Sequence, residues 1–138
     1  MSILYSASAT VIGGREGHGR TSDGKVDVDL SIPKELGGEG GPGTNPEQLF
    51  AIAYSACFLG AIRFVADLQK KDVGDASVTG EVSVNTDNGG WKLSVELHCK
   101  LPGVSKPEAE YIVSQAHEKI CPYSKATRGN VDVRLVVE

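Results

Sequence analysis

The stretch that decides the fold is residues 44–66, TNPEQLFAIAYSACFLGAIRFVA. It predicts one long buried helix, because Asn45 is a suitable N-cap, Pro46 fits a position that needs no amide hydrogen, and Glu47 suits the positive end of the helix dipole. No charge occurs from Leu49 to Phe58, so every face of this part of the helix needs cover. The rest of the chain has few apolar residues that could bury all faces of this helix. We therefore expect a second subunit to bury part of its surface.

The composition indicates one soluble globular domain, residues 1–138, with 40% hydrophobic and 23% charged residues. A net charge of −4 without a basic cluster disfavours nucleic acid and anionic membranes as partners. The first residues lack the basic start and apolar core of a signal peptide, and Ser55, Gly60 and Arg63 make the long helix a poor membrane span. We therefore expect a cytoplasmic protein.

Alternating apolar and polar residues predict strands on both sides of the long helix. A second helix is predicted after Ser105-Lys106-Pro107-Glu108, which is a capping-box signature with proline in the first turn. Pro122 should end that helix and place Cys121 at the boundary between helix and loop. The predicted strands are residues 4–12, 26–32, 77–86, 91–100 and 131–137. The order ββ-α-ββ-α-β describes an α+β domain with mainly antiparallel sheets.

No stretch predicts a bound cofactor or metal. Residues 13–25 are glycine-rich but lead into a strand, so they are predicted as a long hairpin loop that carries Arg15, and residues 37–43 lack the ending of a phosphate-binding loop. Cys99 points with the apolar residues of its strand and His98 with the charged ones. Neither a C-x₂-C pair nor an H-x₃-H pair exists, so we expect no zinc site.

The chain has three cysteines, which cannot all pair within one chain, and a reducing compartment disfavours a permanent disulfide. Cys99 is predicted to be a small core residue. Cys57 lies in the long helix, and Cys121 lies at the boundary between helix and loop. Neither position is typical of a cysteine that only packs in the core. The alternative is that they too are structural, since buried cysteine is usually inert.

Several motifs resemble the organic hydroperoxide resistance proteins (Ohr) of the OsmC/Ohr family of thiol peroxidases. They are residues 44–50 followed by 54–58, CPYS at 121–124 and ATRGN at 126–130, with shorter matches at 13–15, 35–38 and 77–80. The resemblance extends from the first strand to the last. Lys125 departs from the asparagine of many relatives, at a position with no catalytic role.

The resemblance implies an intertwined homodimer in which Cys57 is the peroxidatic cysteine and Cys121 the resolving cysteine. Arg15 matches the arginine beside the thiolate, and Glu47 matches the carboxylate that holds this arginine. It also implies reduction of alkyl and lipid hydroperoxides to alcohols, with a Cys57–Cys121 disulfide reopened by dihydrolipoyl groups of lipoylated proteins. The apolar neighbours expected to favour such substrates are Leu49, Phe50, Phe58 and Ile62.

The chemistry of these roles can be checked against the sequence. Attack on a peroxide needs a thiolate, whereas burial in an apolar helix raises the pKa of a thiol, so a cation must compensate. Arginine stays charged when desolvated and can bind a carboxylate while it faces sulfur. Glu47 precedes Cys57 by ten residues, roughly 15 Å along a helix, so it must act through the arginine or come from the partner chain.

Two alternatives remain open at this point. The OsmC branch shares the two cysteines, although the contexts Tyr54-Ser55 and Tyr123-Ser124 resemble Ohr more closely. A redox sensor or small-ligand-binding dimer could use the same cysteine pair without turnover, but no basic face is visible to transmit a signal to nucleic acid.

Overall fold

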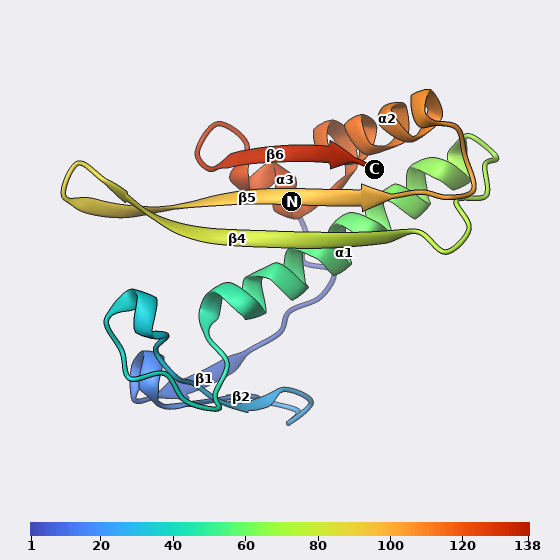
Figure 1. Cartoon of the computed structure of the whole chain (residues 1–138). Helices are drawn as coiled ribbons and strands as arrows, with labels where there is room; N and C mark the ends of the chain where they lie inside the picture. Colours follow the sequence, from blue (N-terminus) through green and yellow to red (C-terminus); the bar gives the residue numbers. More distant parts are fainter. The chain divides into compact units, whose positions relative to one another are not determined.

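The computed structural model describes all 138 residues and divides them into two compact units, Met1–Leu49 and Phe50–Glu138 (Figure 1). Three strands and two short 3₁₀ turns precede the long helix α1. The elements are β1 (Ala9–Ile12), η1 (Gly14–Glu16), β2 (His18–Thr21), β3 (Asp27–Asp29), η2 (Lys34–Leu36), α1 (Pro46–Leu68), β4 (Ser77–Asp87), β5 (Gly90–Lys100), α2 (Lys106–Gln115), the π-helical turn η3 (Ala116–Ile120), α3 (Pro122–Thr127) and β6 (Asp132–Val137). The α+β class is confirmed.

The N-terminal unit contains an antiparallel sheet in the order β1-β2-β3, with Val11 opposite Gly19 and Gly19 opposite Val28. The short turn η1, which carries Arg15, links β1 to β2. The predicted cap of α1 is also present, because the Asn45 side-chain oxygen accepts the Gln48 backbone N–H at 2.8 Å. The chain therefore enters the long helix as the sequence predicts.

Strand β2 corrects the prediction that residues 13–25 form a loop. The segment His18–Thr21 has no alternation of apolar residues, which is the signal that sequence reasoning uses for a strand. It is a strand because its backbone pairs on both sides, with β1 and with β3. The order of elements therefore begins with three strands where the sequence predicted two.

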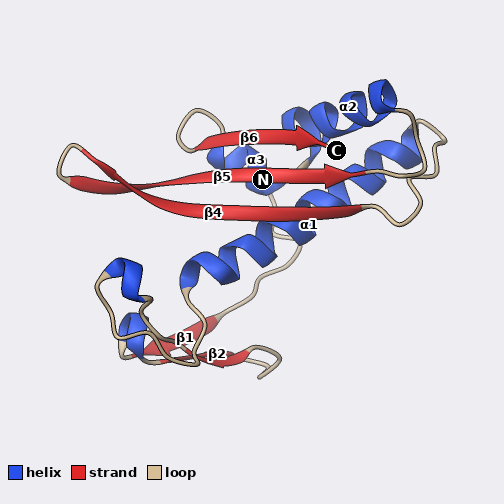
Figure 2. Ribbon diagram, viewed as in Figure 1, coloured by secondary structure: helices blue, strands red, loops and turns tan.

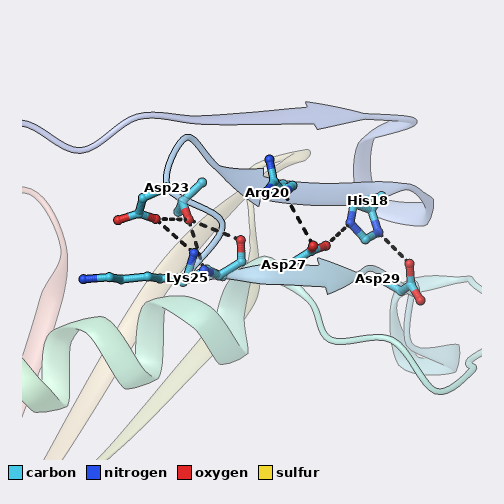
Figure 3. A network of polar contacts seen from close by, with 8 residues as sticks. His18, Arg20, Asp23, Lys25, Asp27 and Asp29 are labelled. Carbon is cyan, nitrogen blue, oxygen red and sulfur yellow. Dashed lines mark hydrogen bonds and ion pairs between the residues drawn. The ribbon is translucent and has the colours of Figure 1, made fainter.

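One face of this sheet carries an ion-pair network (Figure 3). His18 on β2 lies between two carboxylates of β3, with Nδ1 at 2.7 Å from Asp29 and Nε2 against Asp27. Arg20 also contacts Asp27, at 3.5 Å. The carboxylate of Asp29, and then that of Asp27, raises the pKa of the His18 imidazole. Both ring nitrogens can donate only in the imidazolium form, so protonation of His18 supports the pairing of β2 with β3.

This network predicts a pH dependence. Because the pKa of His18 is raised on folding, its contribution is complete below its ordinary value of about 6.5 and is lost as the pH rises through the folded value. NMR titration should show the His18 imidazole titrating above the ordinary value, and the β3 amides should lose protection, relative to their intrinsic exchange rates, at higher pH. Asp29→Asn should move the His18 midpoint down. A midpoint at or below the ordinary value in the wild type would contradict the network.

The C-terminal unit contains a second sheet, in the order β4-β5-β6. Strands β4 and β5 form a long antiparallel hairpin that turns at Asn88 and Gly89, whose φ values of 48° and 84° suit a tight two-residue turn. Strand β6 pairs in parallel with β5. Figure 2 shows α1 and α2 on one side of this sheet, where Val95, Leu97 and Cys99 of β5 belong to the core.

Helix α1 is buried along one side and exposed along the other. Tyr54, Phe58 and Ile62 are fully buried in the core of the C-terminal unit. The backbone of β4 approaches the helix closely at Gly80, where a Cβ atom would lie 2.4 Å from Ser55 Oγ. By length and composition alone α1 could cross a membrane, but the core helix of a soluble protein passes the same test. The burial of one side of α1 in the core fits a core helix.

The helical region after β5 is longer than predicted. Ser105 caps α2 by accepting the Glu108 backbone N–H at 3.3 Å, which confirms the predicted start of this helix, although the Glu108 carboxylate accepts from the Ser105 hydroxyl group, at 3.1 Å, and not from its backbone N–H. The helix then widens into the turn η3 and ends at Cys121, but the next element is the short helix α3 and not a loop. Proline disfavours the interior of a helix and favours its first position, so Pro122 both ends one helix and begins the next.

Candidate active site

The structure brings Cys57 and Cys121 together. Cys57 lies in the middle of α1, and Cys121 lies between η3 and α3. Both thiols are free, and their sulfur atoms are 3.7 Å apart although the residues are 64 positions apart in sequence. A disulfide needs about 2 Å between the sulfurs, so a small movement would join them. The predicted pairing of these two cysteines is therefore geometrically possible within one chain.

The two sulfurs have different surroundings. Cys57 is partly exposed, whereas Cys121 is 1% exposed. Burial, and then the adjacent Cys121 thiol, raises the pKa of the Cys57 thiol, while a hydrogen bond from the Tyr123 backbone N–H acts in the opposite direction. The direction agrees with the sequence argument that Cys57 needs a compensating cation.

A buried chain of hydrogen bonds supports the turn that carries Cys121. Tyr54 Oη lies 2.9 Å from Ser124 Oγ and 3.1 Å from Thr127 Oγ1, and His117 Nδ1 lies 2.7 Å from Ser124 Oγ. Thr127 donates to the Ser124 carbonyl at 3.1 Å, so its hydroxyl oxygen accepts from Tyr54. Tyr54 then accepts from Ser124, and Ser124 accepts from His117, which places the proton of the neutral imidazole on Nδ1.

The neutral state of His117 is consistent with its environment, because burial lowers the pKa of its imidazole. The hydrogen bonds thus run in one direction, from His117 through Ser124, Tyr54 and Thr127 to the Ser124 carbonyl. Each hydroxyl in this chain donates one hydrogen bond and accepts another. Satisfied buried networks of this kind fix the geometry of the backbone that carries them.

Three aromatic rings, those of Phe50, Tyr54 and Tyr123, pack against one another on the two elements that carry the cysteines. The Tyr123 ring centroid lies 5.8 Å from that of Tyr54 and 6.3 Å from that of Phe50. Phe58 and Ile62, which the sequence suggested as substrate neighbours, are fully buried core residues and cannot line an open surface. Phe50 is partly exposed and Tyr123, two residues after Cys121, is exposed, so both rings offer accessible apolar surface.

Arg15 and Glu47 form the other predicted pair. Arg15 Nη1 and Nη2 donate to the two carboxylate oxygens of Glu47 at 3.0 and 2.7 Å. This bidentate contact lowers the pKa of Glu47 and raises that of Arg15. Both residues belong to the N-terminal unit and to the same chain, so the structure shows that Glu47 holds Arg15 without a residue from a partner.

Other side chains that could bind a metal lie in the core or on the second sheet. Cys99 is buried in the core, as predicted, and burial raises its pKa to about 12. Ligand atoms of Glu81, Glu96 and His98 lie within 4.8 Å of one another. However, Glu96 already contacts His98 at 3.0 Å and Arg134 at 3.0 Å. Glu96, His98 and Arg134 therefore form an ion-pair network on the sheet.

Sequence reasoning missed the supporting hydrogen bonds of Tyr54, His117, Ser124 and Thr127. One signal was available, because a tyrosine in a buried helix needs a partner for its hydroxyl group. The partners themselves come from a helix that the sequence did not predict, more than 60 residues further along the chain. Their identity could not follow from local pattern.

Comparison with known proteins identifies the family. A model of the family described as OsmC-like protein matches residues 37–136, and the chain belongs to this family. The Organic hydroperoxide resistance protein of Xanthomonas axonopodis pv. citri (strain 306) is 50% identical over 136 residues, which cover 98% of this chain and 95% of that protein. These findings confirm the resemblance drawn from the sequence motifs.

Solved structures agree with this assignment. A crystal structure from Legionella pneumophila, described as an organic hydroperoxide resistance protein OsmC, is 54% identical, with a TM-score of 0.93 over 99% of each chain. The crystal structure of the organic hydroperoxide resistance protein OhrB of Bacillus subtilis is 44% identical, with a TM-score of 0.91, and the match covers 99% of this chain and 100% of that one. The fold is therefore that of the Ohr branch.

Proposed function

We propose that this protein is a thiol peroxidase that reduces organic hydroperoxides to alcohols. The observation that carries the proposal is the 3.7 Å separation of the Cys57 and Cys121 sulfurs in a chain whose relatives are named organic hydroperoxide resistance proteins. The accessible rings of Phe50 and Tyr123 favour an alkyl or lipid hydroperoxide over hydrogen peroxide. No bound metal, haem or nucleotide is needed for this chemistry.

In the proposed cycle, the Cys57 thiolate attacks the terminal peroxide oxygen. The O–O bond breaks, the alkoxide takes a proton and leaves as the alcohol, and Cys57 becomes a sulfenic acid. The Cys121 thiol then displaces the sulfenic hydroxyl group, which leaves as water, and a Cys57–Cys121 disulfide forms. The hydroperoxide is reduced by two electrons and the two cysteines are oxidised by two.

Arg15 is proposed to favour the thiolate of Cys57, with Glu47 as its positioning residue. The bidentate pair at 2.7 and 3.0 Å fixes the plane of the guanidinium group. Arginine has five N–H donors. Those that do not contact Glu47 remain free for a second acceptor. This role extends the sequence argument that a desolvated thiolate requires a permanent cation.

An external dithiol is proposed to reopen the disulfide, as a dihydrolipoyl group of a lipoylated protein would. Such donors occur in the cytoplasm, which is a reducing compartment, and we propose that the protein acts there. Antioxidant defence is the cellular role that corresponds to this activity.

Turnover tests this proposal. Purified protein should consume tert-butyl or cumene hydroperoxide catalytically with dihydrolipoamide as reductant, and hydrogen peroxide much more slowly. The disulfide should appear when one equivalent of hydroperoxide is added without reductant. Oxidation of the two cysteines without catalytic turnover would instead support a redox sensor, and no reaction of Cys57 with hydroperoxide would exclude both functions.

We also propose that the working unit is a homodimer. Along the exposed side of α1, five uncharged residues follow one another at intervals of four positions, and all are exposed: Ile52, Ala56, Gly60, Phe64 and Leu68. Residues spaced by four form a ridge along a helix, and such ridges are the usual contact between packed helices. Ile52 is 69% exposed and Leu68 65%, so a second chain would cover apolar surface that this chain leaves open.

The dimer can be tested with a charge placed in the middle of this ridge. Gly60 has open space where a side chain would begin, so Gly60→Glu should fold but separate the subunits. Sedimentation equilibrium at micromolar concentration should give a dimer for the wild type and a monomer for the variant. Glu110→Lys, on the exposed side of α2, is the matched control and should remain dimeric. An active wild-type monomer would refute the dimer.

A further inference from the structure

The two sulfurs of the cysteine pair are not equivalent, and this difference determines how the disulfide is reopened. We propose that the reducing thiolate attacks Sγ of Cys57 and expels Cys121 as the leaving thiolate, an inference that rests on the proposed function. The mixed disulfide with the reductant therefore forms on Cys57. Access, hydrogen bonding and the anchoring of the Cys121 turn support this regiochemistry.

Access favours attack at Cys57. The attacking sulfur must reach its target on the side opposite the bond that breaks, so the attacked sulfur needs open space. Cys57 is partly exposed, whereas Cys121 is 1% exposed. The residues that bury Cys121 belong to its own chain, and a partner subunit or a bound reductant protein can only add to that burial.

Hydrogen bonding favours Cys121 as the leaving group. The Ser124 backbone N–H donates to Cys121 Sγ at 3.5 Å, and a donor of this kind stabilises negative charge on sulfur more than neutral sulfur. Cys57 also accepts a backbone N–H, from Tyr123, but the donor at Cys121 belongs to Ser124, whose side chain contacts Tyr54 and His117. The charge released on opening should therefore reside on Cys121.

The position of this N–H donor is held from several directions. The Ser124 hydroxyl group contacts Tyr54 at 2.9 Å and His117 at 2.7 Å. The Cys121 backbone N–H donates to the Ala116 carbonyl at 2.9 Å, and its carbonyl accepts the Lys125 N–H at 3.0 Å. Cys121 thus sits in a fixed turn, where it would remain as a thiolate while the reductant stays attached to Cys57.

The step balances with the dithiol as the only reductant. One thiolate of the dithiol forms a bond to Cys57 Sγ, the Cys57–Cys121 bond breaks, and its electron pair stays on Cys121 Sγ. The second thiol of the reductant gives up its proton, attacks the reductant sulfur of the mixed disulfide, and releases Cys57. The dithiol ends as a cyclic disulfide, oxidised by two electrons, and its two protons balance the two thiols that reform.

A trapping experiment with 2-mercaptoethanol tests the proposal. The Cys57–Cys121 disulfide is prepared with diamide, so that its formation does not depend on peroxidase activity. The oxidised protein is mixed briefly with 2-mercaptoethanol and quenched in guanidinium chloride with N-ethylmaleimide, and both cysteines are analysed by peptide mass spectrometry. At the earliest times we expect 2-mercaptoethanol on Cys57 and N-ethylmaleimide on Cys121, by at least about tenfold. Equal labelling, or 2-mercaptoethanol mainly on Cys121, would overturn the proposal.

Two variants test the contribution of the anchored turn. Ser124→Ala keeps the backbone N–H but removes the hydroxyl group that Tyr54 and His117 contact, so the preference for Cys57 should fall several-fold. Ser114→Ala, which removes one side-chain contact at 3.5 Å on α2, should keep the wild-type ratio. An unchanged ratio in Ser124→Ala would show that the anchoring plays no part. Because the disulfide is made chemically, failure here is distinct from an absence of hydroperoxide turnover.

Discussion

Replacing Cys57 by serine should reduce hydroperoxide consumption to the uncatalysed background. A serine hydroxyl group cannot be ionised at this site or form a sulfenic acid, so neither step of the cycle is available to it. Cys121→Ser should behave differently, because it leaves the attacking sulfur in place. We expect one turnover and then arrest, with a sulfenic acid at Cys57 that a dimedone-type reagent traps or that excess hydroperoxide oxidises further. Stopped-flow mixing with cumene hydroperoxide would separate the two variants.

The third cysteine supplies the control for this experiment. Cys99 is fully buried on β5, and its pKa is raised to about 12, so it carries almost no thiolate near neutral pH. Cys99→Ala should keep the single-turnover rate and lower stability by roughly 1 kcal/mol, the scale for removing a small group from a core. Loss of the first turnover in Cys121→Ser to the same extent as in Cys57→Ser would refute the assigned roles.

The sequence predicted those parts of the fold that local pattern determines. Asn45 and Ser105 cap their helices as expected, because a cap needs only residues within one turn. The hairpin of β4 and β5 was predictable from the alternation of its strands and from the turn at Asn88 and Gly89. The core position of Cys99 was predictable from the same alternation.

The parts that were missed depend on pairing partners or on residues with two structural uses. Strand β2 has glycine and charged residues where a pattern-based prediction looks for apolar ones, and its partners β1 and β3 make it a strand. Pro122 was interpreted only as a helix terminator, although the same residue type begins helices. The pairing of Cys57 with Cys121 came from family resemblance, since no local rule joins residues 64 positions apart.

Replacing Arg15 should have the second large effect, through the ionisation of Cys57. Burial and the adjacent Cys121 raise the pKa of the Cys57 thiol, and the proposed mechanism needs a cation to offset this. An opposite charge near an ionisable group shifts its pKa by about 1 to 3 units. Since each unit changes the thiolate fraction tenfold below the pKa, Arg15→Ala should lower the rate at pH 7 by about 10- to 1,000-fold.

Two further substitutions separate the charge of Arg15 from its geometry. Arg15→Lys keeps the charge but cannot reproduce the bidentate contact with Glu47 at 2.7 and 3.0 Å, so it should recover little activity. Glu47→Gln keeps the arginine and loosens its orientation, and should cost less than Arg15→Ala. Arg20→Ala is the matched control, because Arg20 lies on β2 and contacts Asp27 at 3.5 Å.

The direct measurement is the pH dependence of Cys57 alkylation in each variant. In Arg15→Ala the midpoint should rise, and the lost peroxidase rate should return as the pH increases, because thiolate forms again at higher pH. A variant that had lost activity by misfolding would not recover in this way. A Cys57 midpoint in Arg15→Ala equal to that of the wild type and of Arg20→Ala would show that Arg15 does not act on the thiol through its charge.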